Sequence, residues 1–237
     1  MNIIVTGASR GIGFEIVKGF AGKPGNRIIA LSRNIKNLEK LKNVCRSMPS
    51  GRNVEIIKAD LSDTVRMTSW LIPRIQQFFT ELDILINNAG YLVNKPFEKI
   101  QPEELENTIH INLKVPFLFI QALIGLLKNA DSPHILNISS MGGIHGSVKF
   151  PGLTAYSAAK GGLGILTECL AEEYRDSGIS FNCLALGAVQ TEMFEEAFPG
   201  SKASLTTTEI APFIVDFALN GHKIFNGKIL PVSISTP

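Results

Sequence analysis

Short apolar runs alternate with longer segments of helical period along the chain. Strands are predicted at residues 2–5, 27–31, 54–58, 84–87, 134–138, 180–184 and 228–232. Apolar positions recurring at the period of a helix predict helices over 11–21, 35–47, 64–79, 102–127, 155–176 and 209–219. Strand cores such as IIV and ILNI are apolar without alternation, which is typical of strands that helices cover on both faces.

This strand and helix alternation predicts a parallel sheet of about seven strands with right-handed crossovers, a doubly wound α/β fold. No linker-like or low-complexity stretch interrupts the sequence, so residues 1–237 are expected to form a single domain. In such sheets ligands bind beyond the carboxyl ends of the strands. Candidate functional residues are therefore expected directly after the strands.

Composition narrows the class of protein. Hydrophobic residues make up 45% of the chain and charged residues 19%, as in ordinary globular proteins. The 23 basic and 21 acidic residues are scattered, so no nucleic-acid surface is expected. The cysteines, Cys45, Cys169 and Cys183, are widely spaced and form no CxxC, which suits reduced thiols in a cytoplasmic protein without a structural metal.

The longest apolar run, residues 115–127, does not indicate a membrane protein. It contains Pro116, Gln121 and Gly125, and it is shorter than the roughly 18 to 20 residues of a membrane span. We expect this run to be a buried helix and expect no membrane partner. The N-terminus goes straight from a strand into a glycine turn, so no signal peptide is expected.

The turn after the first strand reads TGASRGIG and opens a predicted helix. Gly7 permits a tight turn, Gly11 lets the backbone approach a pyrophosphate, and Gly13 lets the helix pack close to the strand. The helix N-terminus offers free N–H groups to an anion. The turn therefore predicts a dinucleotide site, to which Ser9, Arg10 and Ile12 contribute.

The same residues also match G-x-S-x-G, the nucleophile elbow of serine hydrolases. That elbow needs an oxyanion-hole N–H from a loop upstream of the serine, and only eight residues precede Ser9. Gly13 would also have no role in an elbow. A serine hydrolase is therefore rejected.

The second strand ends in Ser32 and Arg33, where an NAD-binding protein usually has an acidic residue for the ribose hydroxyls. A carboxylate would repel a 2′-phosphate, whereas a guanidinium pairs with it. Arg33, helped by Arg10, therefore favours NADP(H) as the cofactor over NAD.

Across nearly its whole length the sequence resembles the classical short-chain dehydrogenase/reductase family. The motifs that carry the resemblance occur in the family's order: TGASRGIG, the pair Asp60 and Leu61, the NNAG motif with Asn88, Ala89 and Gly90, Asn112, Ser140, and the YxxxK motif of Tyr156 and Lys160. The resemblance implies a Rossmann-type fold and an oxidoreductase that moves a hydride between the cofactor and a carbonyl or alcohol carbon of a small molecule.

The spacing of Tyr156 and Lys160 has a chemical meaning of its own. Four residues apart on a predicted helix, both side chains leave the same face. An ammonium beside a phenol favours the phenolate, so we expect the pKa of Tyr156 to fall from its usual value of about 10 toward the operating pH.

The resemblance also implies a role for each catalytic residue. Tyr156 would exchange the proton of the substrate oxygen, Lys160 would tune the tyrosine and hold the nicotinamide ribose, and Ser140 would donate a hydrogen bond to the substrate oxygen. Asn112 would anchor a water on a proton path to Lys160. Ser139 is adjacent to Ser140 and would point to the other face of a strand, and the choice between the two stays open.

Further expectations concern the C-terminal third. Gly187, Val189 and Thr191 fit the family's nicotinamide loop, although Leu186 stands where the family usually has proline. Residues 190–208 suit a substrate lid. The resemblance implies a homodimer or homotetramer. A dinucleotide-binding redox sensor without turnover is the alternative function, and neither the substrate nor the physiological direction follows from the sequence.

Overall fold

The computed structural model describes residues 1–234, which fold around a parallel sheet of seven strands. The strand order is β3-β2-β1-β4-β5-β6-β9, so the order reverses between β1 and β4. The strands are β1 (Asn2–Thr6), β2 (Arg27–Ser32), β3 (Val54–Lys58), β4 (Ile84–Asn87), β5 (His134–Ser140), β6 (Ser180–Leu186) and β9 (Lys228–Val232). A separate two-stranded sheet pairs β7 (Val189–Gln190) with β8 (Leu205–Thr206). The predicted doubly wound parallel sheet is confirmed.

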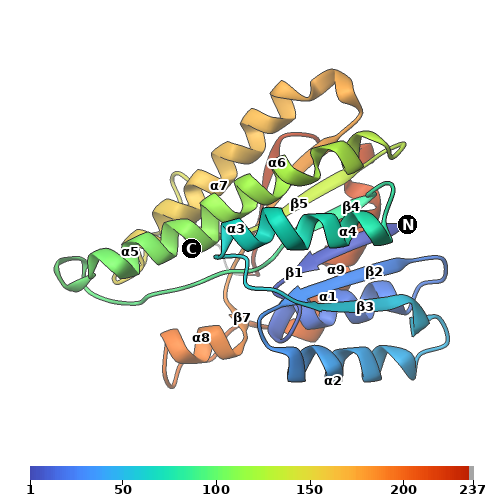
Figure 1. The fold of residues 1–237 in the computed structure, drawn as a ribbon. Coiled ribbons are helices and arrows are strands. Elements are labelled where there is room, and N and C mark those ends of the chain that lie inside the picture. Colours follow the sequence, from blue (N-terminus) through green and yellow to red (C-terminus); the bar gives the residue numbers. More distant parts are fainter. Residues whose placement is uncertain (235–237) are drawn as a thin grey trace.

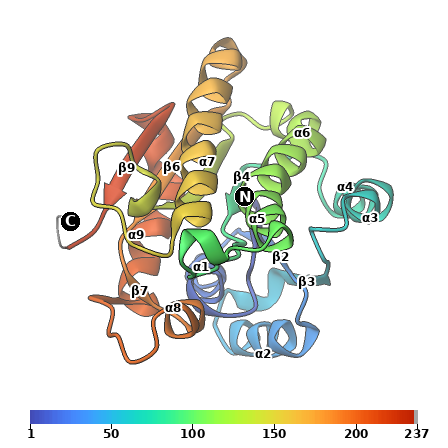
Figure 2. The same ribbon diagram turned by 90° about the vertical axis from the view of Figure 1, so that its left-hand side faces the viewer.

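Helices cover both faces of the sheet (Figures 1 and 2). One layer contains α1 (Gly11–Ala21), α2 (Ile35–Arg46) and α9 (Thr207–Asn220). The other contains α3 (Thr64–Arg66), α4 (Ile72–Phe78), α5 (Pro102–Ile109), α6 (Val115–Lys128) and α7 (Thr154–Glu173). Short 3-10 turns lie at Gly51–Asn53, Phe97–Lys99, Met141–Gly143, Arg175–Ser177 and Gly221–Lys223. The remaining helix, α8 (Glu192–Ala197), lies beside β7 and away from both layers (Figure 1).

Each face of the sheet has its own core. Ile3 and Val5 of β1 pack into the core under α1, α2 and α9, whereas Ile4 packs into the core under α4, α6 and α7. Every residue of β1 is therefore buried, which explains why the strand sequence is apolar without alternation.

Two predicted helices are interrupted by a wider π turn, at Met67–Leu71 and at His110–Lys114. Pro73 and Pro116 follow these turns, and a proline cannot donate to the carbonyl four residues before it. For Pro116 that carbonyl belongs to Asn112, which lies inside the π turn. The interruption thus falls on a predicted catalytic residue, and π turns are frequent at functional sites.

One stretch, Pro102–Lys128, has the length and mean hydropathy, 1.6, of a membrane-spanning helix. Its Phe119, Leu123 and Leu127 are fully buried against the sheet, so packing within the domain accounts for much of its apolar character. This burial agrees with the buried helix predicted for residues 115–127.

Candidate active site

A cavity of about 620 Å³ lies at the carboxyl edge of the sheet and extends from the turn after β1 to the end of β5 and the start of α7. Of the predicted site residues, only Gly13 and Asn112 do not line it. The topology therefore brings together residues that are up to about 180 positions apart, because the carboxyl ends of parallel strands share one edge.

The glycine turn has the geometry that the sequence predicted. Gly7 and Gly11 have φ values of 67° and 58°, a region that side chains with a Cβ rarely occupy. At Gly13 an added Cβ would lie 2.4 Å from the Gly7 carbonyl oxygen and 2.5 Å from Asn88 Nδ2. The turn is thus a tight backbone cradle at the N-terminus of α1, which is the shape that a pyrophosphate requires.

The ends of β1 and β4 are joined by a hydrogen-bond cluster that the sequence analysis missed. Thr6 Oγ1 accepts from the backbone N–H groups of Asn88 and Ala89, each at 3.0 Å. Asn88 Nδ2 donates to the Thr6 carbonyl oxygen at 3.0 Å. Asn88 was predicted as a cofactor contact and lines the cavity, and its side chain amide also holds the glycine turn. The threonine that opens TGASRGIG was the available signal.

Arg10 and Arg33, the two arginines predicted to meet a 2′-phosphate, have different surroundings. Arg33 is exposed at the cavity edge after β2, as predicted. Arg10 instead forms an exposed ion pair with Glu196, at 3.1 Å. Arg10 also lines the cavity, so its assistance to Arg33 at a 2′-phosphate stays a prediction. The sequence could not place the carboxylate of α8 beside Arg10. Ser9 and Ser32 directly precede these arginines in the chain, and the Ser32 hydroxyl donates to the Ser9 hydroxyl at 2.7 Å.

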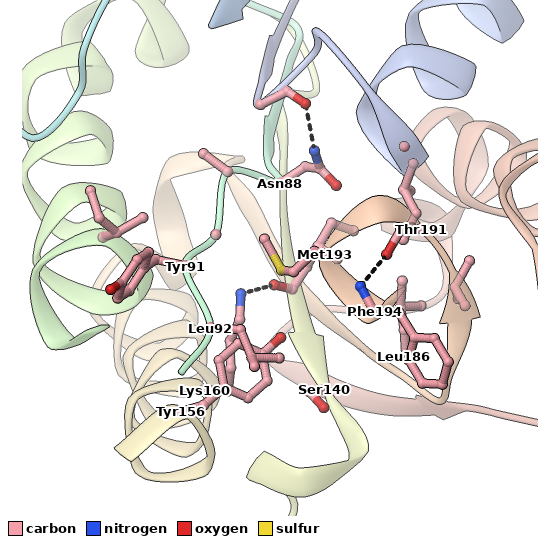
Figure 3. Close-up of a pocket in the computed structure, with 18 of the residues that line it drawn as sticks. Asn88, Tyr91, Leu92, Ser140, Tyr156, Lys160, Leu186, Thr191, Met193 and Phe194 are labelled. Carbon is pink, nitrogen blue, oxygen red and sulfur yellow. Dashed lines mark hydrogen bonds between the residues drawn. The ribbon is translucent and has the colours of Figure 1, made fainter. Parts of the chain in front are cut away.

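Tyr156 and Lys160 leave the same face of α7 and point into the cavity (Figure 3). Lys160 Nζ lies 5.8 Å from the centroid of the Tyr156 ring and donates to the Ile138 carbonyl oxygen at 2.8 Å. The lysine is 4% exposed, and burial lowers its pKa to about 8. Part of the Lys160 population is therefore neutral near physiological pH.

The pKa of Tyr156 moves in the direction opposite to the prediction. Burial raises the pKa of Tyr156 to about 12, and a hydrogen bond with Ser140 only partly opposes this rise. The physical reason is that removal from water disfavours the phenolate, while Lys160 is itself desolvated and makes its hydrogen bond to a backbone carbonyl. In the free protein Tyr156 therefore keeps its proton.

The two adjacent serines of β5 have different surroundings. Ser139 is 6% exposed, and its hydroxyl donates to the Lys160 carbonyl oxygen at 2.9 Å. Ser140 is more exposed, hydrogen-bonds Tyr156, and accepts from the Gly142 N–H at 3.2 Å. The geometry favours Ser140 as the serine that meets a substrate, whereas Ser139 fastens α7 to the sheet.

Asn112 is fully buried behind Gly90. Its Nδ2 donates to the carbonyl oxygens of Tyr91 and Thr108, at 2.7 and 2.8 Å, and its Oδ1 accepts from the Tyr91 N–H at 3.2 Å. The side chain amide therefore hydrogen-bonds the backbone, and Asn112 does not line the cavity. Its role as the anchor of a water stays a prediction. These hydrogen bonds hold the segment of Gly90 and Tyr91 in place beside Lys160.

The nicotinamide loop and the predicted lid follow β6. The Gly187 N–H donates to the Val232 carbonyl oxygen at 2.9 Å, and Val189 is buried in β7. Thr191 Oγ1 caps α8 by accepting from the Phe194 N–H at 3.1 Å, a role beyond the predicted carboxamide contact. The predicted lid, residues 190–208, contains α8 and borders the cavity through Met193, Phe194 and Phe198.

A buried chain of polar side chains ties the catalytic helix to the sheet. Asn87 Nδ2 donates to Asn137 Oδ1 at 2.8 Å, and Asn137 Nδ2 donates to Thr167 Oγ1 at 2.9 Å. These residues lie on β4, β5 and α7. The sequence analysis missed this chain, for which the only signal was an asparagine inside each apolar strand. Within residues 1–234, no cluster of His, Cys, Asp and Glu suitable for a metal ion is present.

Comparison with protein families identifies residues 1–202 as matching the short chain dehydrogenase family. The chain is 31% identical over 212 residues to 3beta-hydroxysteroid dehydrogenase 1 of Eggerthella lenta, covering 89% of this chain and 78% of that protein. It is 30% identical over 243 residues to the 3-oxoacyl-(acyl-carrier-protein) reductase of Chlamydia trachomatis, covering 97% and 94%.

Solved structures show the same similarity. A short chain dehydrogenase of Escherichia coli CFT073, crystallised with NADPH, superimposes with a TM-score of 0.88 at 28% identity, covering 97% of this chain and 95% of that chain. Levodione reductase superimposes with a TM-score of 0.87 at 25% identity, covering 98% and 95%.

Proposed function

Because the chain belongs to the short chain dehydrogenase family, a family of oxidoreductases, we propose that it is an NADP(H)-dependent enzyme that interconverts a carbonyl compound and an alcohol. The observation that carries this proposal is one cavity that contains both the glycine turn and the cluster of Ser140, Tyr156 and Lys160. The glycine turn binds a dinucleotide, and the cluster of side chains transfers the proton of a substrate oxygen.

The residues present fit the dinucleotide. The diphosphate would lie against Gly7, Gly11 and the free N–H groups of α1, where a Cβ on either glycine would be strained. Arg33 would pair with a 2′-phosphate. The remaining contacts that we assign to the cofactor are Ser9, Arg10, Ile12, Asp60, Leu61, Asn88, Ala89, Gly90, Tyr156, Lys160, Gly187, Val189 and Thr191.

The bound cofactor supplies the hydride, and the side chains of this chain handle the proton. During reduction the Tyr156 hydroxyl protonates the carbonyl oxygen, while Ser140 donates a hydrogen bond to that oxygen as negative charge develops on it. A tyrosine whose pKa is about 12 is protonated at neutral pH and is therefore ready to act as an acid. Lys160 faces the resulting phenolate and stabilises it.

The test is consumption of NADPH, followed by its absorbance, with a panel of ketones and oxoacyl thioesters. Tyr156→Phe should lower kcat by at least about 100-fold, the scale of a lost general acid, while NADPH binding measured by fluorescence is kept. Tyr174→Phe is the matched control, because Tyr174 lies at the far end of α7, beside Phe181.

Full activity of Tyr156→Phe would refute the mechanism. NADPH binding without turnover of any compound in the panel would favour the redox sensor instead. We also propose a cytoplasmic homodimer or homotetramer on the strength of the family resemblance, which light scattering of the purified protein tests.

A further inference from the structure

Much of the cavity wall around Ser140 and Tyr156 is apolar. Its apolar side chains come from five separate segments, namely Leu92, Met141, Phe150, Leu153, Leu186, Met193, Phe194 and Phe198. The uncharged polar residues Tyr91, Ser201 and Ser233 also line the cavity. Figure 3 shows four of the apolar side chains, Leu92, Leu186, Met193 and Phe194, in the same pocket as Tyr156. The rings of Phe194 on α8 and Phe198 just after it lie 5.2 Å apart, so the lid presents an aromatic surface to the cavity.

The charged residues of the cavity lie mostly at its other end. Arg10, Arg33 and Asp60 follow β1, β2 and β3, on the side of the sheet away from β5 and β6. Glu192 lies beside the glycine turn, because a Cβ added to Gly11 would be 3.7 Å from its Oε2. Among the residues that line the described cavity, this leaves Lys160 as the charged group at the reaction end, and its ammonium already donates to Ile138.

The lid contains more acidic than basic residues. Residues 190–208 contain three exposed glutamates, Glu192, Glu195 and Glu196, but a single lysine, Lys202. Of the three, Glu196 pairs with Arg10 and Glu192 lines the cavity. Lys149, on the loop before α7, does not line the cavity and donates to the Ser147 hydroxyl at 2.8 Å. An anionic substrate would therefore meet like charge at the lid and an apolar wall inside.

We propose that the substrate is an uncharged carbonyl compound with an apolar body, and that the cavity selects against carboxylates and phosphorylated carriers. This inference rests on the proposed function. A carboxylate inside the apolar wall would lose its hydration without gaining a partner, whereas a neutral apolar group gains from burial.

The first experiment compares two substrates with the same ring and carbonyl group, one neutral and one anionic. NADPH consumption is measured with the methyl ester of an oxocyclohexane carboxylic acid and with the free carboxylate. We expect kcat/KM to be about 100-fold lower for the carboxylate, the cost of burying one unpaired charge. Equal or better turnover of the carboxylate would overturn the proposal.

A second pair separates acyl carriers from neutral ketones. An oxoacyl thioester of N-acetylcysteamine and its coenzyme A counterpart carry the same reacting group, but only the second carries phosphates. No gain from coenzyme A is expected, and a gain above about 10-fold, which corresponds to roughly 1.4 kcal/mol, would overturn the proposal.

A variant tests the wall directly. Phe198→Lys adds an ammonium to the lid side of the cavity and should shift the ester-to-carboxylate ratio of kcat/KM by at least about 10-fold toward the carboxylate. Phe213→Lys is the control, because Phe213 is 45% exposed on α9 and does not line the cavity. An unchanged ratio in a folded Phe198→Lys protein would overturn the assignment of this wall to the substrate.

The outcomes also distinguish the two levels of proposal. If no ketone is reduced, or if Tyr156→Phe keeps full activity, the proposed function fails. If ketones are reduced in a Tyr156-dependent manner but the charged partner of each pair is preferred, only the substrate inference fails.

Discussion

Replacement of Gly13 by alanine tests the close contact between α1 and the turn after β1. The added Cβ would lie 2.4 Å from the Gly7 carbonyl oxygen and 2.5 Å from Asn88 Nδ2, and the first of these is backbone that cannot rotate away. Overpacking of this kind costs about 1–3 kcal/mol. Alanine recovers up to about 1 kcal/mol as a better helix former, so we expect a net loss of about 1–2 kcal/mol.

The matched control is Gly125→Ala, in the middle of α6. Gly125 is exposed, and a Cβ there would meet nothing within 4 Å. This substitution should stabilise the protein by about 0.5–1 kcal/mol, because alanine loses less backbone entropy on folding. The two variants therefore make the same chemical change with opposite expected signs.

Urea denaturation gives the free energy of unfolding of each variant, and thermal denaturation gives its Tm. For a chain of this size, about 1 kcal/mol corresponds to a Tm shift of roughly 2–4 °C. Gly13→Ala should also weaken NADPH binding, because relief of the clash moves the N–H groups of α1 away from Gly7. A Gly13→Ala protein as stable as the wild type, with unchanged NADPH affinity, would refute this reading of the turn.

Further predictions concern charge, pH and buried polarity. Arg33→Ser should weaken NADPH binding about 10-fold and leave NADH binding unchanged. This is the lower end of the range for a charge-assisted hydrogen bond, because Arg33 is exposed. Equal losses of affinity for both cofactors in binding titrations would contradict the 2′-phosphate assignment. Burial lowers the pKa of His134 to about 4, whereas in the unfolded chain it stays near 6.5. The unfolded state therefore binds the extra proton between these values, and the free energy of unfolding should fall as the pH drops from about 6.5 to 4, by up to about 1.4 kcal/mol per unit. His134→Gln should lack this contribution to the pH dependence. Urea denaturation at several pH values measures the free energy of unfolding of both proteins, and the same pH dependence in both would contradict the prediction. Asn137→Leu removes the hydrogen-bond partner that the Asn87 amide and the Thr167 hydroxyl share. The free energy of unfolding should fall by about 1–3 kcal/mol for the unpaired Asn87 amide alone. An unchanged denaturation midpoint would exclude a stabilising role for these buried polar side chains.

The sequence was sufficient to predict the order and type of the main elements. The predicted run at residues 84–87 coincides with β4, which is buried at every position, because a strand covered by helices on both faces is largely apolar. Residues 54–58 coincide with β3, an edge strand that is buried at only two of its five positions. Motif spacing also placed Tyr156 and Lys160 on one helix face, since that relation depends only on the period of the helix. The π turns were not predicted, because the periodicity of a continuous helix hides one extra residue in a turn.

Interactions between distant segments could not be read from the chain. The pairing of Arg10 with Glu196, the commitment of the Asn112 amide to Tyr91 and Thr108, and the different surroundings of Ser139 and Ser140 all depend on which segments meet at the sheet edge. The pKa of Tyr156 shows the same limit most clearly. Four-residue spacing predicted an acidified phenol. Burial is a property of the whole fold, however, and the cost of removing the phenolate from water exceeds the stabilisation by the Ser140 hydrogen bond.

Sequence alone thus determined the local elements, the motifs and their order, because these follow from periodicity and from residue chemistry along the chain. Only the tertiary structure decided which polar groups are already satisfied, which of the two serine hydroxyls donates to a backbone carbonyl, and which apolar side chains gather at the reaction end. The physical reason is that desolvation and hydrogen-bond partnership are set by neighbours in space, and here those neighbours come from strands and helices far apart in the chain.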